Sequence, residues 1–302
     1  MPIFLLMMLG FVFRKINVLN EQFTKSLNSF VFKIALPALV FKELANQDIK
    51  ETWDTGYVFF CFGVTLASII LLLVIAFAFK GISDKAEFVQ ASFRSSAALL
   101  GVGIVTNLYG DAGMVPLMII GAVPLYNVTA VVLLEVLKAK GGISKALLFE
   151  TLKGIITNPI ILGIIVGAVW AAFKIPSPVI FERTVTHVGN TATPLGLMAL
   201  GASLDFKSIG KQAGTVITAT FFKLVGFCAL FLPLAIYIGY TRDKLLAILI
   251  MLGSPTTVSS FVMARSMGHD GQTSAGTVMC TTLLSAFTLT LWLFVLKTLG
   301  LI

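Results

Sequence analysis

The sequence predicts an all-α integral membrane protein with ten transmembrane helices arranged as two inverted five-helix repeats. Two observations lead to this fold class. Of the 302 residues, 57% are hydrophobic and only 12% are charged, whereas soluble domains contain about 45–50% apolar and about 25% charged residues. The chain also repeats itself, and a repeated apolar unit with proline and glycine at matching places is typical of secondary transporters.

The internal repeat is visible at a shift of 157 to 159 positions along the chain. Residues 2–12 (PIFLLMMLGFV) recur at 159–169 (PIILGIIVGAV), which is a shift of 157 positions with proline, leucine, glycine and valine at equivalent places. A shift of 159 carries Asp111 onto Asp270, so the register holds almost to the end of each half. We therefore expect three parts: residues 1–137 as the first five-helix repeat, 138–153 as a basic cytoplasmic connector, and 154–302 as the second, inverted repeat.

Each half contains five apolar segments, and about 20 residues are needed to cross a bilayer as a helix. An odd number of spans per repeat places the second copy upside down in the membrane. The first helix, 1–13, is short and is expected to begin near an interface or to be clipped at its start. The clearest spans are 55–79, 113–134, 154–173, 245–264 and 271–296, and the remaining spans, 24–46, 86–109, 184–204 and 212–241, contain a lysine, arginine or histidine.

The distribution of positive charge predicts the orientation. If the N-terminus lies outside, twelve lysines and arginines flank the spans on the cytoplasmic side and seven on the outer side. Cytoplasmic loops are enriched in these residues, so we expect both termini outside and the protein in the cell membrane. This flanking also accounts for the net charge of +8. The expected partner is the lipid bilayer and not a nucleic acid, since no basic stripe with exposed aromatic residues is present.

The sequence carries no motif of an enzyme or of a metal site. Its two histidines and three cysteines lack metal-ligand spacing, and no Walker A or G-x-S-x-G pattern occurs. We therefore expect no enzymatic activity, no metal and no cofactor. The coupling ion, a proton or sodium, stays open.

Two helices are expected to be interrupted at equivalent places in the two repeats. In the fourth helix Arg94-Ser95-Ser96 precedes Gly101 and Gly103, and the ninth contains Ser254-Pro255-Thr256-Thr257. Proline breaks a helix, and a helix that restarts inside the membrane exposes free N–H groups at its positive end. We expect Ser254 to cap the restarted helix, Pro255 to begin it, and the two breaks to form an anion site. The predicted substrate-binding residues are Ser95, Ser96, Gly101, Gly103, Tyr126, Asn127, Asn190, Ser254, Pro255, Thr256 and Thr257.

These residues also have structural interpretations. Small residues let membrane helices pack closely, and an asparagine can either read a substrate or satisfy freed backbone carbonyls. Three cations lie within spans. Lys33 is interpreted as reaching the interface, Lys223 is open between that role and a functional one, and Arg94, one to two turns before the fourth-helix break, is a candidate for attracting an anion.

The order of these motifs resembles the auxin efflux carrier family of membrane transporters, in its bacterial branch, over nearly the whole chain. The motifs are LPAL at 36–39, FRSS at 93–96 with Gly101, PLYN at 124–127, Asn158-Pro159, TPL at 193–195 with GASL at 201–204, and SPT at 254–256. The family often has asparagine at the place of Ser96 and proline at the place of Gly103, so substrate identity is not carried over.

The resemblance implies crossing broken helices 4 and 9, carboxylate substrates such as malonate or malate in bacterial relatives, and homodimers in many relatives. We therefore expect a secondary active carrier that moves a small organic anion, a mono- or dicarboxylate, by alternating access. Two alternatives stay open: a sodium-coupled symporter of similar fold, and a membrane sensor that binds a ligand without moving it. The direction of transport is open as well.

Overall fold

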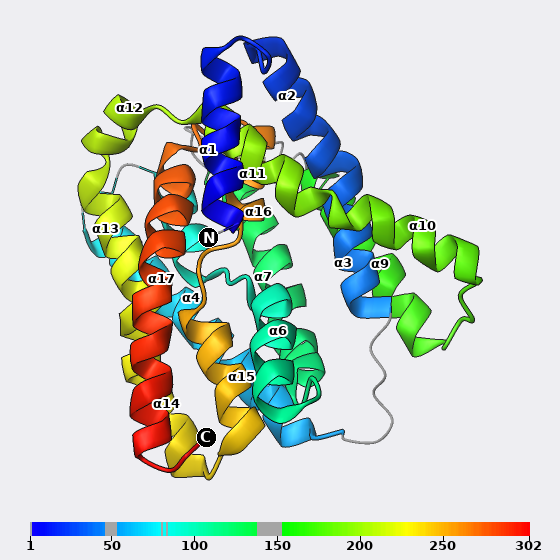
Figure 1. The fold of residues 1–302 in the computed structure, drawn as a ribbon, viewed down its shortest axis with the longest axis vertical. Coiled ribbons are helices and arrows are strands. Elements are labelled where there is room, and N and C mark those ends of the chain that lie inside the picture. Colours follow the sequence, from blue (N-terminus) through cyan, green and yellow to red (C-terminus); the bar gives the residue numbers. More distant parts are fainter. Residues whose placement is uncertain (1, 46–52, 80, 83, 138–152) are drawn as a thin grey trace. The chain divides into compact units, whose positions relative to one another are not determined.

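A computed structural model of the chain describes residues 2–45, 53–79, 81–82, 84–137 and 153–302. These residues form helices and no strands (Figure 1), which confirms the all-α class. Each of the ten segments expected to span the membrane is helical, in one piece or in two. The predicted connector, apart from Lys153, lies outside the described residues.

Four helices among the described residues are long and apolar enough to cross a bilayer. Their hydropathy and their length of 22 to 27 residues match the thickness of the hydrocarbon core. They establish an apolar, membrane-type helical protein. These helices are α4 (Thr55–Ala78), α7 (Val115–Val136), the continuous helix 213–238, and α17 (Gln272–Thr298).

The chain forms two compact units, and each unit takes segments from both halves of the sequence. Unit 1 comprises Met1–Gln47, Asn127–Gly210 and Val258–Ala275, and unit 2 comprises Asp48–Tyr126, Lys211–Thr257 and Gly276–Ile302. Unit 1 includes the helices α1 (Pro2–Lys15), α2 (Glu21–Phe30), η1 (Val31–Ala35), α3 (Leu36–Ala45), α9 (Pro159–Ala172), α10 (Val179–Asn190), α11 (Ala192–Ser203) and α16 (Ser259–Ser266). The short helix α12 (Phe206–Lys211) lies at the boundary of unit 1 in the sequence.

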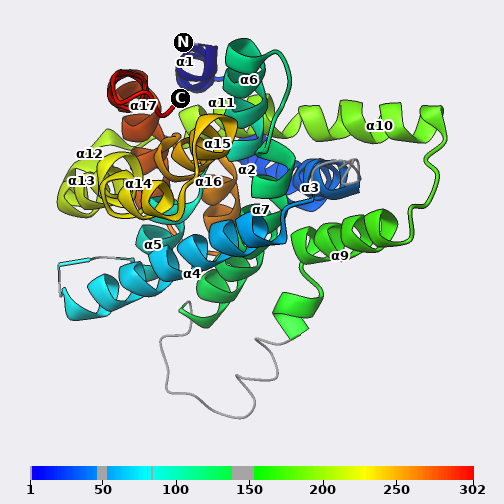
Figure 2. The same ribbon diagram turned by 90° about the horizontal axis from the view of Figure 1, so that it is seen from below.

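Unit 1 is held together by two helix pairs that approach closely at glycines. Helix α1 packs on α11 and α3 packs on α9 (Figures 1 and 2). A Cβ atom on Gly10 would collide with the Met198 carbonyl oxygen, and one on Gly167 would lie 3.1 Å from the Phe41 carbonyl oxygen. The 157-residue shift carries the first contact pair onto the second with the halves exchanged. Small residues at such crossings allow backbones to touch.

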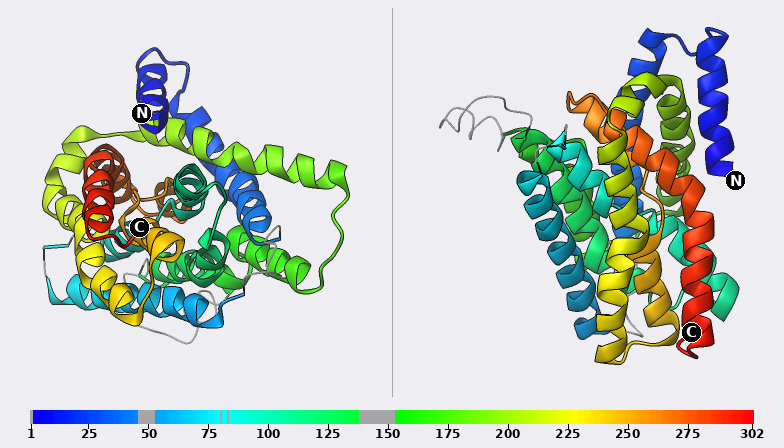
Figure 3. Two further views of the ribbon diagram at one scale, coloured as in Figure 1. Left: turned by 60° about the horizontal axis from the view of Figure 1, so that its bottom comes forward. Right: turned by 90° about the vertical axis from the view of Figure 1, so that its left-hand side faces the viewer.

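Unit 2 surrounds the helix α15 (Arg242–Gly253), in which every residue from Leu245 onward is buried. Helix α17 runs alongside the helix 213–238 (Figure 3), and the Trp292 indole N–H donates to the Leu224 carbonyl at 3.1 Å. Aspartates begin two of the helices, because the Asp54 and Asp84 side chains accept from backbone N–H groups in the first turn. The remaining elements of unit 2 are α5 (Lys85–Phe93), α6 (Ala97–Tyr109), α13 (Ala213–Phe221), η2 (Phe222–Gly226) and α14 (Phe227–Ile238).

Gly201 offers a test of the α1–α11 packing. A Cβ atom at this position would collide with the Met7 carbonyl oxygen, and backbone cannot move aside as a flexible side chain can. We expect Gly201→Ala to lower the stability of the purified protein by about 1–3 kcal/mol, measured as a lower melting temperature in detergent. The control is Gly210→Ala, where a Cβ atom would meet nothing within 4 Å. Equal melting temperatures for the two variants would contradict this packing.

Candidate functional site

Two helices are interrupted within the predicted segments, and the interruptions touch. Helix α5 ends at Phe93 and α6 begins at Ala97, while α15 ends at Gly253 and the next helix begins at Ser259. The Ser96 N–H of the first interruption donates to the Pro255 carbonyl of the second at 3.0 Å. Both residues belong to unit 2. Two non-helical segments, far apart in sequence, therefore share a hydrogen bond inside one compact unit.

The second interruption leaves two backbone carbonyls without their helical donors. In an α-helix the carbonyl of residue i accepts from the N–H of residue i+4. Pro255 has no N–H, so the Met251 carbonyl loses its donor. The Thr256 N–H points instead to the Thr281 hydroxyl oxygen at 3.1 Å, so the Leu252 carbonyl loses its donor as well. Buried carbonyls of this kind need other partners.

Lys223, from the π-helical turn η2, fills this position. Its Nζ donates to the Leu252 carbonyl at 2.8 Å and to the Met251 carbonyl at 3.4 Å, and it lies in hydrogen-bond contact with the Ser95 hydroxyl. The residue is completely buried. A cation is favoured here because the carbonyl end of a helix carries partial negative charge. Lys223 therefore does not reach an interface, and of the two roles left open by the sequence the structure excludes snorkelling.

The two interruptions stabilise each other reciprocally through hydroxyl groups. The Ser95 hydroxyl donates to the Met251 carbonyl at 2.5 Å, and Met251 also accepts from the Tyr126 hydroxyl at 3.3 Å. In return, the Thr256 hydroxyl donates to the Ala91 carbonyl at 2.7 Å. Ala91 and Met251 each lie shortly before an interruption, so each break donates to the helix that precedes the other.

The positions of several predicted residues differ from expectation. Ser254 is the C-cap of α15 and not an N-cap, because its backbone is extended and its N–H still bonds to the Ile250 carbonyl. Pro255 therefore does not begin a helix. In the first interruption Arg94 is the C-cap of α5 and lies at the break, not one to two turns before it. Gly101 and Gly103 lie inside α6, because the chain resumes its helix at Ala97.

The other predicted residues divide between the two units. Tyr126 lies in unit 2 and bonds to the site as described, whereas Asn127 and Asn190 belong to unit 1. Asn127 is buried. Asn190 is exposed at the end of α10, and its side-chain oxygen accepts from Lys42 Nζ at 3.0 Å.

Groups at the two interruptions differ in their exposure and in their hydrogen bonding. Ser96 and Thr257 are half-buried, and no side chain caps the start of α6. The Ser254 hydroxyl is completely buried and has no hydrogen-bond partner among the described residues. A cavity of about 10 Å³ lies against Lys223, Tyr126 and Met251, a volume that holds about one water molecule.

Positive charge exceeds negative charge in the buried part of unit 2. Its buried charged residues, within the described chain, are the cations Arg94 and Lys223 and the carboxylate Glu87 at the start of α5. Sequence reasoning left Lys223 out of the predicted site. The signal that could have identified it is Pro255, because a proline inside a buried helix frees a carbonyl that a neighbouring element must satisfy.

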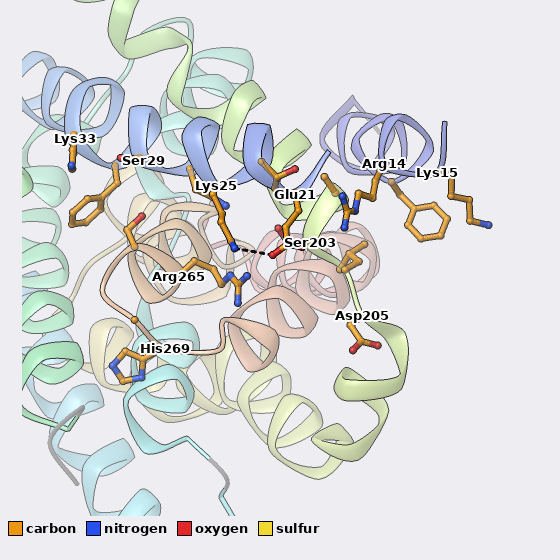
Figure 4. A pocket seen from close by; sticks show the side chains of 18 residues that line it. Arg14, Lys15, Glu21, Lys25, Ser29, Lys33, Ser203, Asp205, Arg265 and His269 are labelled. Carbon is orange, nitrogen blue, oxygen red and sulfur yellow. Dashed lines mark ion pairs between the residues drawn. The ribbon is translucent and has the colours of Figure 1, made fainter. Parts of the chain in front are cut away.

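Unit 1 contains a second polar feature, a cavity of about 790 Å³ whose wall is rich in cations (Figure 4). The carboxylates on the wall are already engaged. Glu21 forms an ion pair with Lys25 at 2.8 Å, and this hydrogen bond lowers the pKa of the Glu21 carboxyl. Hydrogen bonds from Ser208 lower the pKa of the Asp205 carboxyl, and the bond from the Ser208 hydroxyl has a larger effect than the bond from its backbone N–H. The cations that line the cavity are Arg14, Lys15, Lys25, Lys33 and Arg265.

Thr281 tests the diverted backbone at the second interruption. We expect Thr281→Val to leave the buried Thr256 N–H without an acceptor, which costs about 1–3 kcal/mol and lowers the melting temperature. Thr290→Val, on the same helix, is the matched control, because Thr290 is exposed and its hydroxyl bonds only within α17, to Ala286. If Thr290→Val destabilised the protein as much as Thr281→Val, the diverted hydrogen bond would not be important.

Comparison with known proteins identifies the family of this chain. A protein of Rhizobium meliloti (strain 1021) named "Putative malonate transporter" is 25% identical over 98% of this chain and 94% of its own length. An uncharacterized transporter of Methanocaldococcus jannaschii is 24% identical over 97% of the chain and 96% of its own length. The family described as "Membrane transport protein" matches residues 1–293. The chain therefore belongs to this membrane transport protein family, the auxin efflux carriers.

Proposed function

We propose that this protein is a secondary active carrier that moves a small organic anion, a mono- or dicarboxylate, across the cell membrane by alternating access. The observation that carries the proposal is the hydrogen-bonded meeting of two interrupted helices beside the buried ammonium of Lys223. Interrupted helices form the substrate sites of many secondary transporters. The excess of buried positive charge in unit 2 favours an anionic substrate over a cationic one.

The start of α6 supplies the groups that a carboxylate would accept from. The first N–H groups of a helix have no acceptor within it, and they form the positive end of its dipole. Ser95 and Ser96 precede this helix start, and the unpaired Ser254 hydroxyl belongs to the neighbouring interruption. Helix starts of this kind bind carboxylates and phosphates without a formal charge. In this proposal Lys223 adds a formal positive charge beside the helix start.

Alternating access rests on an inverted repeat of five helices in each half. The reciprocal glycine contacts of unit 1 and the reciprocal hydroxyl bonds of unit 2 both support a two-fold relation between the halves. With both termini outside, Arg14, Lys25 and Arg265 lie on the cytoplasmic side. The cation-rich cavity that they line would then raise the local concentration of anions at that face.

The substrate class is supported by the relative from Rhizobium meliloti, whose name refers to malonate. Malonate is a dicarboxylate, and its two charges suit a site that combines a helix start with a buried ammonium. Membership of a transporter family favours a carrier over an enzyme. A ligand-binding sensor would bind the same anion but would not move it, so flux distinguishes the two functions.

A panel of radiolabelled mono- and dicarboxylates, tested in proteoliposomes, would identify a transported substrate. We expect the double variant Pro255→Ala with Thr256→Val to lower its flux at least about tenfold. Alanine restores an N–H that competes for the Met251 carbonyl, and valine removes the hydroxyl bond to Ala91.

Two controls make this experiment decisive. Thr290→Val is expected to transport as the wild type does, and equal yields of folded protein in detergent separate lost transport from lost insertion. Wild-type flux in the double variant would contradict the proposed site. Saturable binding of a carboxylate without any flux would identify a sensor instead of a carrier.

A further inference from the structure

The oxygen atoms around Lys223 form a shell of the kind that binds a small metal cation. Two are backbone carbonyls freed by a helix break, Met251 and Leu252, and the third is the Ser95 hydroxyl oxygen. In sodium-coupled transporters, unwound carbonyls and carbonyl ends of half-helices coordinate the sodium ion. The shell in unit 2 has the same chemistry, but a covalently attached ammonium occupies it.

An ammonium and a sodium ion cannot share this shell. Nζ lies 2.8 Å from the Leu252 carbonyl and 3.4 Å from the Met251 carbonyl, so a metal ion bound to both oxygens would stand beside a positive charge. Repulsion at that separation is strong in a buried environment. The adjoining cavity of about 10 Å³ holds about one water molecule, so it does not have room for a separate hydrated ion.

No carboxylate is needed to hold the ammonium at this position. The three hydrogen-bond partners of Nζ are neutral oxygens, and two of them belong to the carbonyl end of α15, where the helix dipole is negative. An ammonium has three N–H bonds, one for each of these oxygens, and none of the three oxygens cancels its charge, which can therefore balance a substrate carboxylate nearby. Its attachment to the π-helical turn η2 means that the cation does not leave with the substrate.

We infer that the Lys223 ammonium stands in for a coupling sodium ion at the helix break, so that the protein binds and moves its anion without sodium. The transport part of this inference rests on the proposed carrier function, and the cation-site part does not. The cation site consists of the Met251 and Leu252 carbonyls and the Ser95 hydroxyl.

Purified protein in detergent tests the cation site without any substrate. Melting temperatures are compared in sodium chloride and in choline chloride at equal ionic strength. The wild type is expected to melt at the same temperature in both salts. Lys223→Ala vacates the shell, and we expect its melting temperature to rise with sodium concentration and to saturate. Lys223→Ser provides a second variant if the alanine variant does not fold, and Lys297→Met is the control because Lys297 is exposed at the end of α17.

Proteoliposomes test the transport part with radiolabelled malonate as the probe. Wild-type flux is expected to be equal in sodium and choline buffers, whereas Lys223→Ala is expected to lose at least about tenfold of its flux in choline and to regain part of it in sodium. Sodium-dependent wild-type flux, specific stabilisation of the wild type by sodium, or variants that do not respond to sodium in either assay would each overturn the inference. A sodium-stabilised variant in a protein that transports no carboxylate would refute the proposed function and leave the cation site intact.

Discussion

A missing backbone donor at Pro255 determines the polar interior of unit 2. Because this residue has no N–H, the Met251 carbonyl must find its hydrogen bonds outside its own helix, and the turn that follows diverts a second donor to Thr281. Inside lipid or packed protein, no water is present to donate a hydrogen bond to such carbonyls. This requirement is met by three side chains from different elements, Lys223, Ser95 and Tyr126, which all donate to carbonyls at the end of α15.

The same requirement explains why the two interruptions lie together. A single broken helix in an apolar environment exposes donors at one end and acceptors at the other. Two broken helices that meet can exchange partners, as the Ser95 and Thr256 hydroxyls do with carbonyls of the opposite helix. Each exchanged hydrogen bond lowers the free-energy cost of leaving a carbonyl without its helical donor. The arrangement leaves a small polar region inside an apolar unit.

The sequence predicted the helical segments well because their apolar stretches are long and their ends carry charged or turn-forming residues. It predicted the interruption at Pro255 for the right reason, but it placed the helix restart too early, since three residues after the proline are not helical. At the first interruption the visible glycines, Gly101 and Gly103, were misleading. The break occurs at Arg94, where long-range hydrogen bonds outweigh local preference.

Lys223 shows a second limit of sequence reasoning. Its distance along the helix from the interface allows it to reach water, and only the contacts of α15 and the first interruption show why it does not. The division of the chain into two units was equally hidden, because each unit combines segments from both halves. Contacts between distant segments leave no local pattern in composition or periodicity.

The π-helical turn η2 lies within the helix 213–238 and sets which face of that helix points to its neighbours beyond the turn. A turn with i→i+5 bonds contains one residue more than an α-turn, so every residue after it is rotated by about 100° relative to an uninterrupted helix. The face that Phe227–Ile238 presents to its neighbours is therefore fixed by a single extra residue at Phe222–Gly226. Removing that residue would leave the composition of the helix almost unchanged while turning its whole second half to a different side.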